Sequence, residues 1–152
     1  MRVILSDIQQ KLSSSPEAPG LARGASAGGL EAFTQLLEEL PADTGMGFVF
    51  LQHLDPSHPS LLADALTKAT KMPVTQAQDG ERVEPNHVYV IPPESDLALL
   101  HGALTLLPRR EDRRPHLPVD FFLRSLAEDR GSHAIGIVLS GTASDGTDGL
   151  KC

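Results

Sequence analysis

The sequence has little cysteine and few aromatic residues. Its 152 residues include one cysteine, Cys152, and no tryptophan, and aromatic residues make up 4% of the chain. A single cysteine excludes an internal disulfide framework and a Cys-x-x-Cys metal site, and it favours a reducing compartment, so we expect the cytoplasm. So few aromatic rings argue against a surface on which nucleic-acid bases or sugars stack.

Long hydrophobic runs and an excess of positive charge are also lacking. No apolar stretch reaches the roughly 18 residues of a membrane-spanning helix, and the opening MRVILSDIQQ does not have the pattern of a secretory signal. Asp and Glu number 20 against 13 Lys and Arg, which gives a net charge of −7. We therefore expect neither nucleic-acid binding nor membrane insertion.

The chain divides into a tail and one domain. Residues 1–20 end in SSSPEAPG, a Ser-, Pro- and Gly-rich run that is typical of a linker. Residues 21–152 alternate short apolar runs with segments of helical periodicity. This alternation predicts an α/β fold, with a doubly wound, mostly parallel, Rossmann-like sheet flanked by helices.

The periodicity also predicts the individual elements. Strands are expected at 21–26, 47–53, 88–93 and 134–140, a β-hairpin insertion at 97–108, and helices at 29–40, 59–70 and 119–131. Only about one turn of residues follows the loop after the last strand, so we expect C-terminal structure that covers the sheet to be missing. The alternative is a native terminus that leaves one sheet face bare.

Three predicted strand ends carry side chains that suit acyl transfer. Ser26 ends the first strand, His53 ends the second, and Asp145 lies in the loop after the last. Ligands of open parallel sheets bind at the carboxyl ends of the strands, so these side chains are expected at one edge. A hydroxyl that attacks, an imidazole that takes its proton and a carboxylate that orients the ring are the parts of a hydrolase triad.

Each of these residues also has a simpler interpretation. GASAG around Ser26 fits the G-x-S-x-G nucleophile turn, with the amides of Ala27 and Gly28 placed to stabilise an oxyanion, but it also fits a phosphate-binding or merely tight turn. By itself, His53 is more often a histidine bonded to a backbone group, and Asp145 an Asx turn or a helix N-cap. No acidic or His/Cys cluster has the spacing of a calcium or zinc site, so no metal is expected.

Three ordered blocks of the sequence are more specific than any single motif. They read GASAGGLEAF at 24–33, FLQHLDPSHPSLLADAL at 50–66 and VLSGTASDGTDGL at 138–150. Over about residues 21–150 the chain resembles the catalytic domain of the protein-glutamate methylesterases of bacterial chemotaxis. SAGG and LSGTASDGT especially resemble versions that are fused to, or encoded with, a receptor methyltransferase.

The resemblance implies a serine esterase with Ser26 as nucleophile, His53 as base and Asp145 as the orienting carboxylate, without a metal or organic cofactor. The implied reaction is hydrolysis of glutamate γ-methyl esters on methyl-accepting chemoreceptors, releasing methanol; some members also deamidate receptor glutamines. The implied partners are those receptors and a fused or neighbouring methyltransferase. These 152 residues hold no phosphoacceptor domain of the kind that precedes many members, so we do not expect phosphorylation control in cis.

Three positions depart from the family pattern. Chemotaxis members commonly have threonine where this chain has Ala27 and methionine where it has Thr142, changes that alter the substrate cleft and leave the triad intact. Arg23 replaces an apolar residue of the first strand, where a buried unpaired guanidinium costs on the order of several kcal/mol. Arg23 therefore reaches solvent or a partner, or the strand beside Ser26 is perturbed.

Two other classes of function remain open at this point. Arg23 and the missing end favour a catalytically impaired docking or signalling module of a chemotaxis-like system, which binds receptor or methyltransferase without hydrolysis. The Gly-rich turn also fits a nucleotide-binding domain. Against that domain, the chain lacks the acidic ribose-binding residue expected about 20 residues after the turn.

Overall fold

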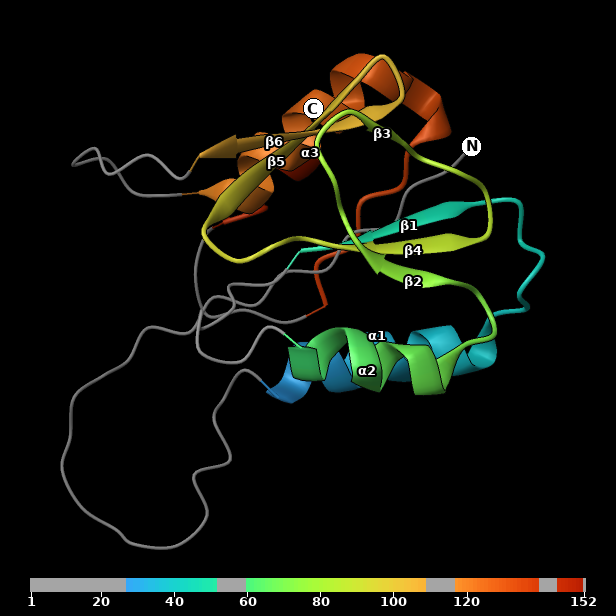
Figure 1. Ribbon diagram of the computed structural model, residues 1–152. Coiled ribbons are helices and arrows are strands. Elements are labelled where there is room, and N and C mark those ends of the chain that lie inside the picture. The colour runs from blue at the N-terminus through green and yellow to red at the C-terminus, as the bar shows by residue number, and fades with distance from the viewer. Residues whose placement is uncertain (1–26, 52–59, 109–116, 140–144, 152) are drawn as a thin grey trace, which may run out of the picture.

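The computed structural model describes residues 27–51, 60–108, 117–139 and 145–151 (Figure 1). The elements are α1 (Ala27–Glu39), β1 (Gly47–Phe50), α2 (Ser60–Ala69), β2 (Val74–Gln76), β3 (Glu81–Arg82), β4 (His87–Val90), β5 (Ser95–Leu100), β6 (Ala103–Pro108), α3 (Pro118–Arg130), and the 3-10 turns η1 (Gly131–His133) and η2 (Gly149–Lys151). Within these ranges, no helix is both long and apolar enough to cross a membrane.

The centre of the fold is a parallel sheet in the order β1-β4-β2. In β1, Phe48 and Phe50 face one side while Val49 and, just beyond the strand, Leu51 face the other, and all four are almost completely buried. A continuous apolar run is typical of a parallel strand that is covered on both faces. The strand predicted at 47–53 and the one predicted at 88–93 are thus confirmed over their described, paired residues.

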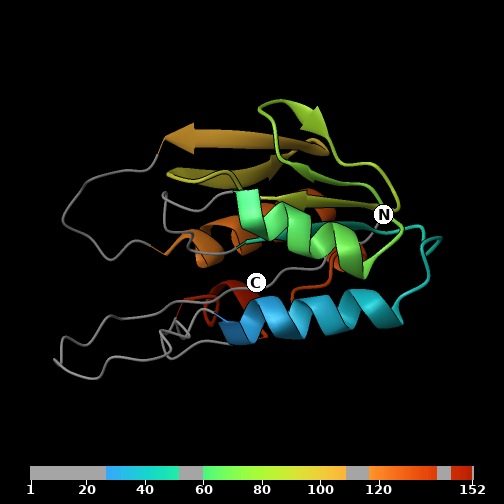
Figure 2. The ribbon, with the colours of Figure 1, turned by 60° about the horizontal axis from the view of Figure 1, so that its bottom comes forward.

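Helices α1 and α2 cover one face of this sheet and lie side by side beneath it (Figures 1 and 2). Phe33 and Leu37 recur at helical spacing on α1, which directs both side chains to the sheet. The ring of Phe33 stacks on that of Phe50, with centroids 4.5 Å apart. The helices predicted at 29–40 and 59–70 are confirmed, and α1 begins at Ala27, immediately after Ser26.

Helix α3 and an antiparallel sheet, ordered β3-β6-β5, cover the other face (Figure 1). Val49 and Tyr89 of the parallel sheet share a core with Phe122 and Leu126 of α3. The buried hydroxyl of Ser125 on α3 accepts a hydrogen bond from the amide of Leu99 in β5, at 2.9 Å. Helices therefore flank both faces of a mostly parallel sheet, so the predicted α/β class is confirmed.

The β-hairpin predicted at 97–108 is confirmed as β5 and β6. His101 and Gly102 both have positive φ, 51° and 79°, as a two-residue hairpin turn of the twist-matching type requires. The helix predicted at 119–131 is confirmed as α3, and Gly131 ends it with a φ of 51°. Local turn chemistry thus explains where these elements end.

The strand predicted at 134–140 is wrong for its described residues. Residues 134–139 form no strand, and they pair with none of the described strands. Ile137 and Leu139 are partly buried and pack against the core that α1 and α2 share with the parallel sheet, which accounts for their apolar character. The strand predicted at 21–26, Arg23 within it and the tail at 1–20 lie outside the described residues.

Candidate active site

Asp145 is the predicted triad residue whose surroundings the structure describes. Ser26, His53 and Thr142 lie outside the described residues, so their predicted convergence with Asp145 stays a prediction. Ala27 and Gly28 form the first turn of α1 directly after Ser26. The amides of a helix's first turn have no partner within the helix, so this position suits the stabilisation of an anion; the oxyanion role of Ala27 and Gly28 stays a prediction.

The Asp145 side chain is buried, with 3% of its surface exposed, at the N-terminus of α3. Its Oδ1 accepts hydrogen bonds from the amides of Asp120, at 2.9 Å, and Gly146, at 3.0 Å. Its Oδ2 accepts one from the amide of Val119, at 3.2 Å. Three backbone amides thus hold the carboxylate in one orientation.

This arrangement joins the two interpretations of Asp145. Helix α3 has Leu117 at its N-cap, and a leucine side chain cannot accept a hydrogen bond from the free amides of the first turn. Asp145 supplies that acceptor from a loop more than 20 residues further along the chain. Asp145 therefore does cap a helix, and the same contacts fix the direction of its carboxylate.

The carboxylate of Asp145 retains acceptor capacity after these bonds are counted. An ionised carboxylate has about four acceptor positions, two on each oxygen. Donors among the described residues occupy two positions on Oδ1 and one on Oδ2. Since buried acceptors are normally paired, the second position on Oδ2 suits one further donor, such as an imidazole N–H.

Burial raises the pKa of the Asp145 carboxyl above its ordinary value. The three amide hydrogen bonds oppose this rise, because they stabilise the ionised form, and the neighbouring carboxylate of Asp120 adds to it. The partial positive charge at the N-terminus of α3 also favours the anion. The site thus places a desolvated carboxylate among fixed dipoles, an environment that suits a group that orients an imidazole and stabilises its charged form.

A second buried carboxylate, that of Asp120, lies beside Asp145. It is 4% exposed, and its Oδ1 accepts a hydrogen bond from the amide of Gly149, at 2.6 Å. Sequence reasoning missed Asp120, because an acidic residue in the first turn of a helix is ordinary and its partner lies far along the chain. No local sequence pattern signals this contact, because Asp120 and Gly149 are 29 positions apart.

The two glycines of SDGTDG let this loop approach α3. Gly146 has a φ of +85°, and a Cβ there would lie 3.0 Å from side-chain carbons of Val119 and Val138. A Cβ on Gly149 would lie 2.7 Å from Cβ of Leu123 and 3.0 Å from Cα of Asp120. These contacts explain why glycine is required on both sides of the turn that carries Asp145 toward the helix.

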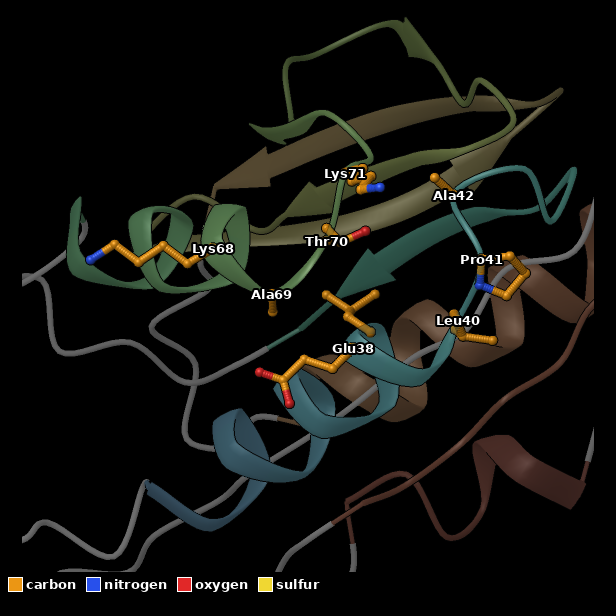
Figure 3. Close-up of a pocket in the computed structure, with 9 residues that line it drawn as sticks. Glu38, Leu40, Pro41, Ala42, Lys68, Ala69, Thr70 and Lys71 are labelled. Atoms are coloured by element: carbon orange, nitrogen blue, oxygen red, sulfur yellow. The ribbon is translucent and has the colours of Figure 1, made fainter.

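A separate cavity of about 360 Å³ lies at the C-terminal ends of α1 and α2 (Figure 3). Glu38, Lys68, Thr70 and Lys71 supply its polar lining, and it contains no histidine or thiol. Helix α1 has 13 residues and is therefore about 20 Å long, so the cavity is remote from the N-terminus of this helix at Ala27. The cavity is not the site that the sequence predicts.

Comparison with known proteins identifies relatives of this chain. The family model described as CheB methylesterase matches residues 21–152. A "Protein-glutamate methylesterase/protein-glutamine glutaminase" of Pectobacterium atrosepticum is 37% identical over 134 residues, which cover 86% of this chain and 38% of that protein. A "Protein-glutamate methylesterase/protein-glutamine glutaminase 2" of Xanthomonas oryzae pv. oryzae is 38% identical, over 86% of this chain and 37% of that protein. The chain thus spans little more than a third of these curated relatives.

A solved structure gives the corresponding match in three dimensions. It is the "Crystal structure of Thermotoga maritima CheB methylesterase catalytic domain", with a TM-score of 0.76 and 27% sequence identity. The match covers 99% of this chain and 72% of that one. Family model, curated relatives and solved structure all agree, and this chain belongs to the CheB methylesterase family.

Proposed function

We propose that this chain hydrolyses glutamate γ-methyl esters on methyl-accepting chemoreceptors and releases methanol. The proposal includes deamidation of receptor glutamines, in which ammonia replaces methanol as the leaving group. Membership of the CheB methylesterase family supports it, as do relatives that are named as both a methylesterase and a glutaminase. The observation that carries it is the buried Asp145 carboxylate, held by three amides, with one acceptor position on Oδ2 to which no described residue donates.

In the proposed mechanism, Oγ of Ser26 attacks the ester carbonyl carbon while His53 takes the hydroxyl proton. Asp145 accepts a hydrogen bond from the other ring nitrogen of His53, which fixes the tautomer and stabilises the imidazolium. The amides of Ala27 and Gly28 stabilise the oxyanion, and Thr142 lines the substrate cleft. Methanol leaves with the proton from His53, and a water activated by the same ring then hydrolyses the acyl-enzyme.

The proposal also concerns the organisation and the setting of the chain. Residues 21–152 form the catalytic domain, and residues 1–20 form a linker. The start of the family match at residue 21 supports this division. The reaction takes place in the cytoplasm, within chemotaxis signalling and its phosphorelay. The partners are the receptors and a fused or neighbouring receptor methyltransferase, and no metal or organic cofactor takes part.

Methanol release from methylated receptor tests this proposal. The Ser26→Ala variant is expected to release no methanol above background, because it has no nucleophile. Ser132→Ala is the matched control, since Ser132 is exposed in η1. Unchanged release by Ser26→Ala would refute the assignment. A folded wild-type chain that binds receptor without hydrolysis at any pH would instead support the docking module.

A further inference from the structure

Asp120 connects both ends of the loop that carries Asp145 to the first turn of α3. Its backbone amide donates to Oδ1 of Asp145, at 2.9 Å. Its own Oδ1 accepts from the amide of Gly149, four residues further along the loop, at 2.6 Å. One residue therefore binds the loop at its beginning through the main chain and at its end through the side chain.

We propose that Asp120 is a positioning residue for Asp145, acting through the Asp120–Gly149 hydrogen bond that closes the 145–149 loop onto α3. This inference rests on the proposed function, because it assigns Asp120 a part in orienting the triad carboxylate. Asp120 touches no reacting atom in this account. It sets where Asp145 lies, and Asp145 then sets the direction of the His53 ring.

Burial is the first support for this role. Both carboxylates are almost completely buried, Asp120 at 4% and Asp145 at 3% exposure. The Asp120 carboxylate disfavours the charge of Asp145, so a second acid at this point carries a cost. Asp145 alone would be sufficient to cap α3. The second acid, Asp120, is needed only if the 145–149 loop must be held at both ends.

The packing of Gly149 is the second, independent support. A Cβ at this position would overlap Cβ of Leu123 and lie 3.0 Å from Cα of Asp120, so the loop main chain lies directly against the α3 backbone. The amide of Leu150, in η2, also donates to the carbonyl of Gly146, at 3.1 Å, which draws the two ends of the loop together. The loop is thus a closed unit that is docked on the helix at Asp120.

Four variants of the full 152-residue chain separate positioning from general stability. Asp120→Ala removes the acceptor for Gly149, while Asp120→Asn keeps an amide oxygen there and removes only the charge. Asp129→Ala and Asp129→Asn are matched controls. Asp129 lies on the same helix and its Oδ2 also accepts a loop amide, that of Gly102 at 3.0 Å, at the opposite end of α3 from Asp145.

With folded samples, Asp120→Ala is expected to lower kcat on the order of 100-fold at unchanged KM, the scale of loss that a displaced catalytic group produces. Asp120→Asn is expected to have a kcat close to that of the wild type, because its amide oxygen still accepts the Gly149 hydrogen bond. Both Asp129 variants are expected to retain wild-type kcat. Equal kcat for Asp120→Ala and wild type would overturn the proposal. So would an Asp120→Asn variant as slow as Asp120→Ala, or an equal loss of kcat in Asp129→Ala.

Amide hydrogen exchange tests the role of Asp120 without an activity assay. Its result therefore does not depend on whether the chain is a methylesterase. In Asp120→Ala, exchange of the Gly149 amide is expected to speed up roughly 10- to 100-fold, as the loss of a hydrogen bond to a charged group implies. The amides of Val119 and residue 120, which report the position of the Asp145 carboxylate, are expected to follow. If the amides of Gly149, Val119 and residue 120 exchange in Asp120→Ala at the wild-type rate, the inference is wrong. This holds even if the wild-type chain releases no methanol.

Discussion

Oδ1 of Asp145 lies 2.9 Å from the amide nitrogen of Asp120, so the first turn of α3 holds the carboxylate of the proposed triad. The bond joins residues 25 positions apart and is almost completely buried. Since α3 also packs on β5 and shares a core with the parallel sheet, the orientation of Asp145 depends on the packing of the whole domain.

Replacing Asp145 with alanine is expected to reduce kcat roughly 10⁴-fold, the loss seen when a triad histidine is left without its orienting carboxylate. Asp148→Ala is the control, because Asp148 lies in the same loop with an exposed side chain beside Lys151. Steady-state methanol release measures both. A loss of similar size in Asp148→Ala would show that the loop, and not the carboxylate, is what activity requires.

The pH dependence of stability follows from the raised pKa of Asp145. The folded state binds this proton more tightly than the unfolded state, whose pKa is near the ordinary 3.8. The stabilising contribution is therefore complete below the unfolded pKa and is lost as the pH rises through the raised folded pKa. Relative to Asp145→Asn, the free energy of unfolding of the wild type is expected to fall with rising pH across this window.

Urea unfolding of the two proteins at a series of acidic pH values measures that difference. The difference is expected to level off once the pH is above the raised pKa, because Asp145 is then ionised in both states. A difference that instead increases with pH would mean that the amides of α3 outweigh burial, and that the pKa of Asp145 is lowered in the folded protein.

Gly149→Ala is expected to destabilise the protein by about 1–3 kcal/mol and to lower kcat, because the new methyl group overlaps Cβ of Leu123 and presses on the α3 backbone. Gly136→Ala is the matched control. Its Cβ would lie 2.7 Å from a terminal methyl of Leu150 and 2.9 Å from one of Leu123, and such side-chain ends can move aside. Equal losses for the two variants, in chemical unfolding and in turnover, would contradict the close docking of the loop.

Phe33→Ala tests the packing of α1 on the sheet. The Phe33 ring is fully buried and stacks on Phe50, so its removal is expected to cost about 3–5 kcal/mol in the free energy of unfolding. Phe121→Ala removes the same side chain from α3, where it is 44% exposed, and is expected to cost much less. Denaturant unfolding measures the free energy of unfolding of both variants. Equal losses in Phe33→Ala and Phe121→Ala would contradict the packing of α1 against the core.

The hydrophobic pattern of the sequence was sufficient to predict the helices and strands whose apolar side chains lie in the core. The apolar run at 48–51 predicted β1, and the spacing of Phe33 and Leu37 predicted α1. The short polar strands β2 and β3 have no such signal, because VTQ and ER contribute mainly backbone pairing. The run at 134–139 packs against the core without pairing to any described strand, and periodicity does not distinguish such a run from a paired strand.

The candidate site could be predicted in part. Motifs indicated Asp145 as a triad residue, which stays a prediction. The same residue type also indicated a helix cap, and that interpretation is confirmed, for α3 and not for a local helix. Asp120 was missed because its role is defined by a partner 29 residues away, and no local pattern encodes that contact. Long-range hydrogen bonds of this kind are visible only once the chain has folded.

The most direct test of the central claim is whether Ser26, His53 and Asp145 act as one unit. The measurement is kcat for methanol release by the three single alanine variants and by the triple variant. Residues that act as a unit are strongly non-additive, so the triple variant is expected to be about as slow as Ser26→Ala alone. Losses that multiply across the three positions, or a single variant of His53 or Asp145 with wild-type kcat, would contradict the account.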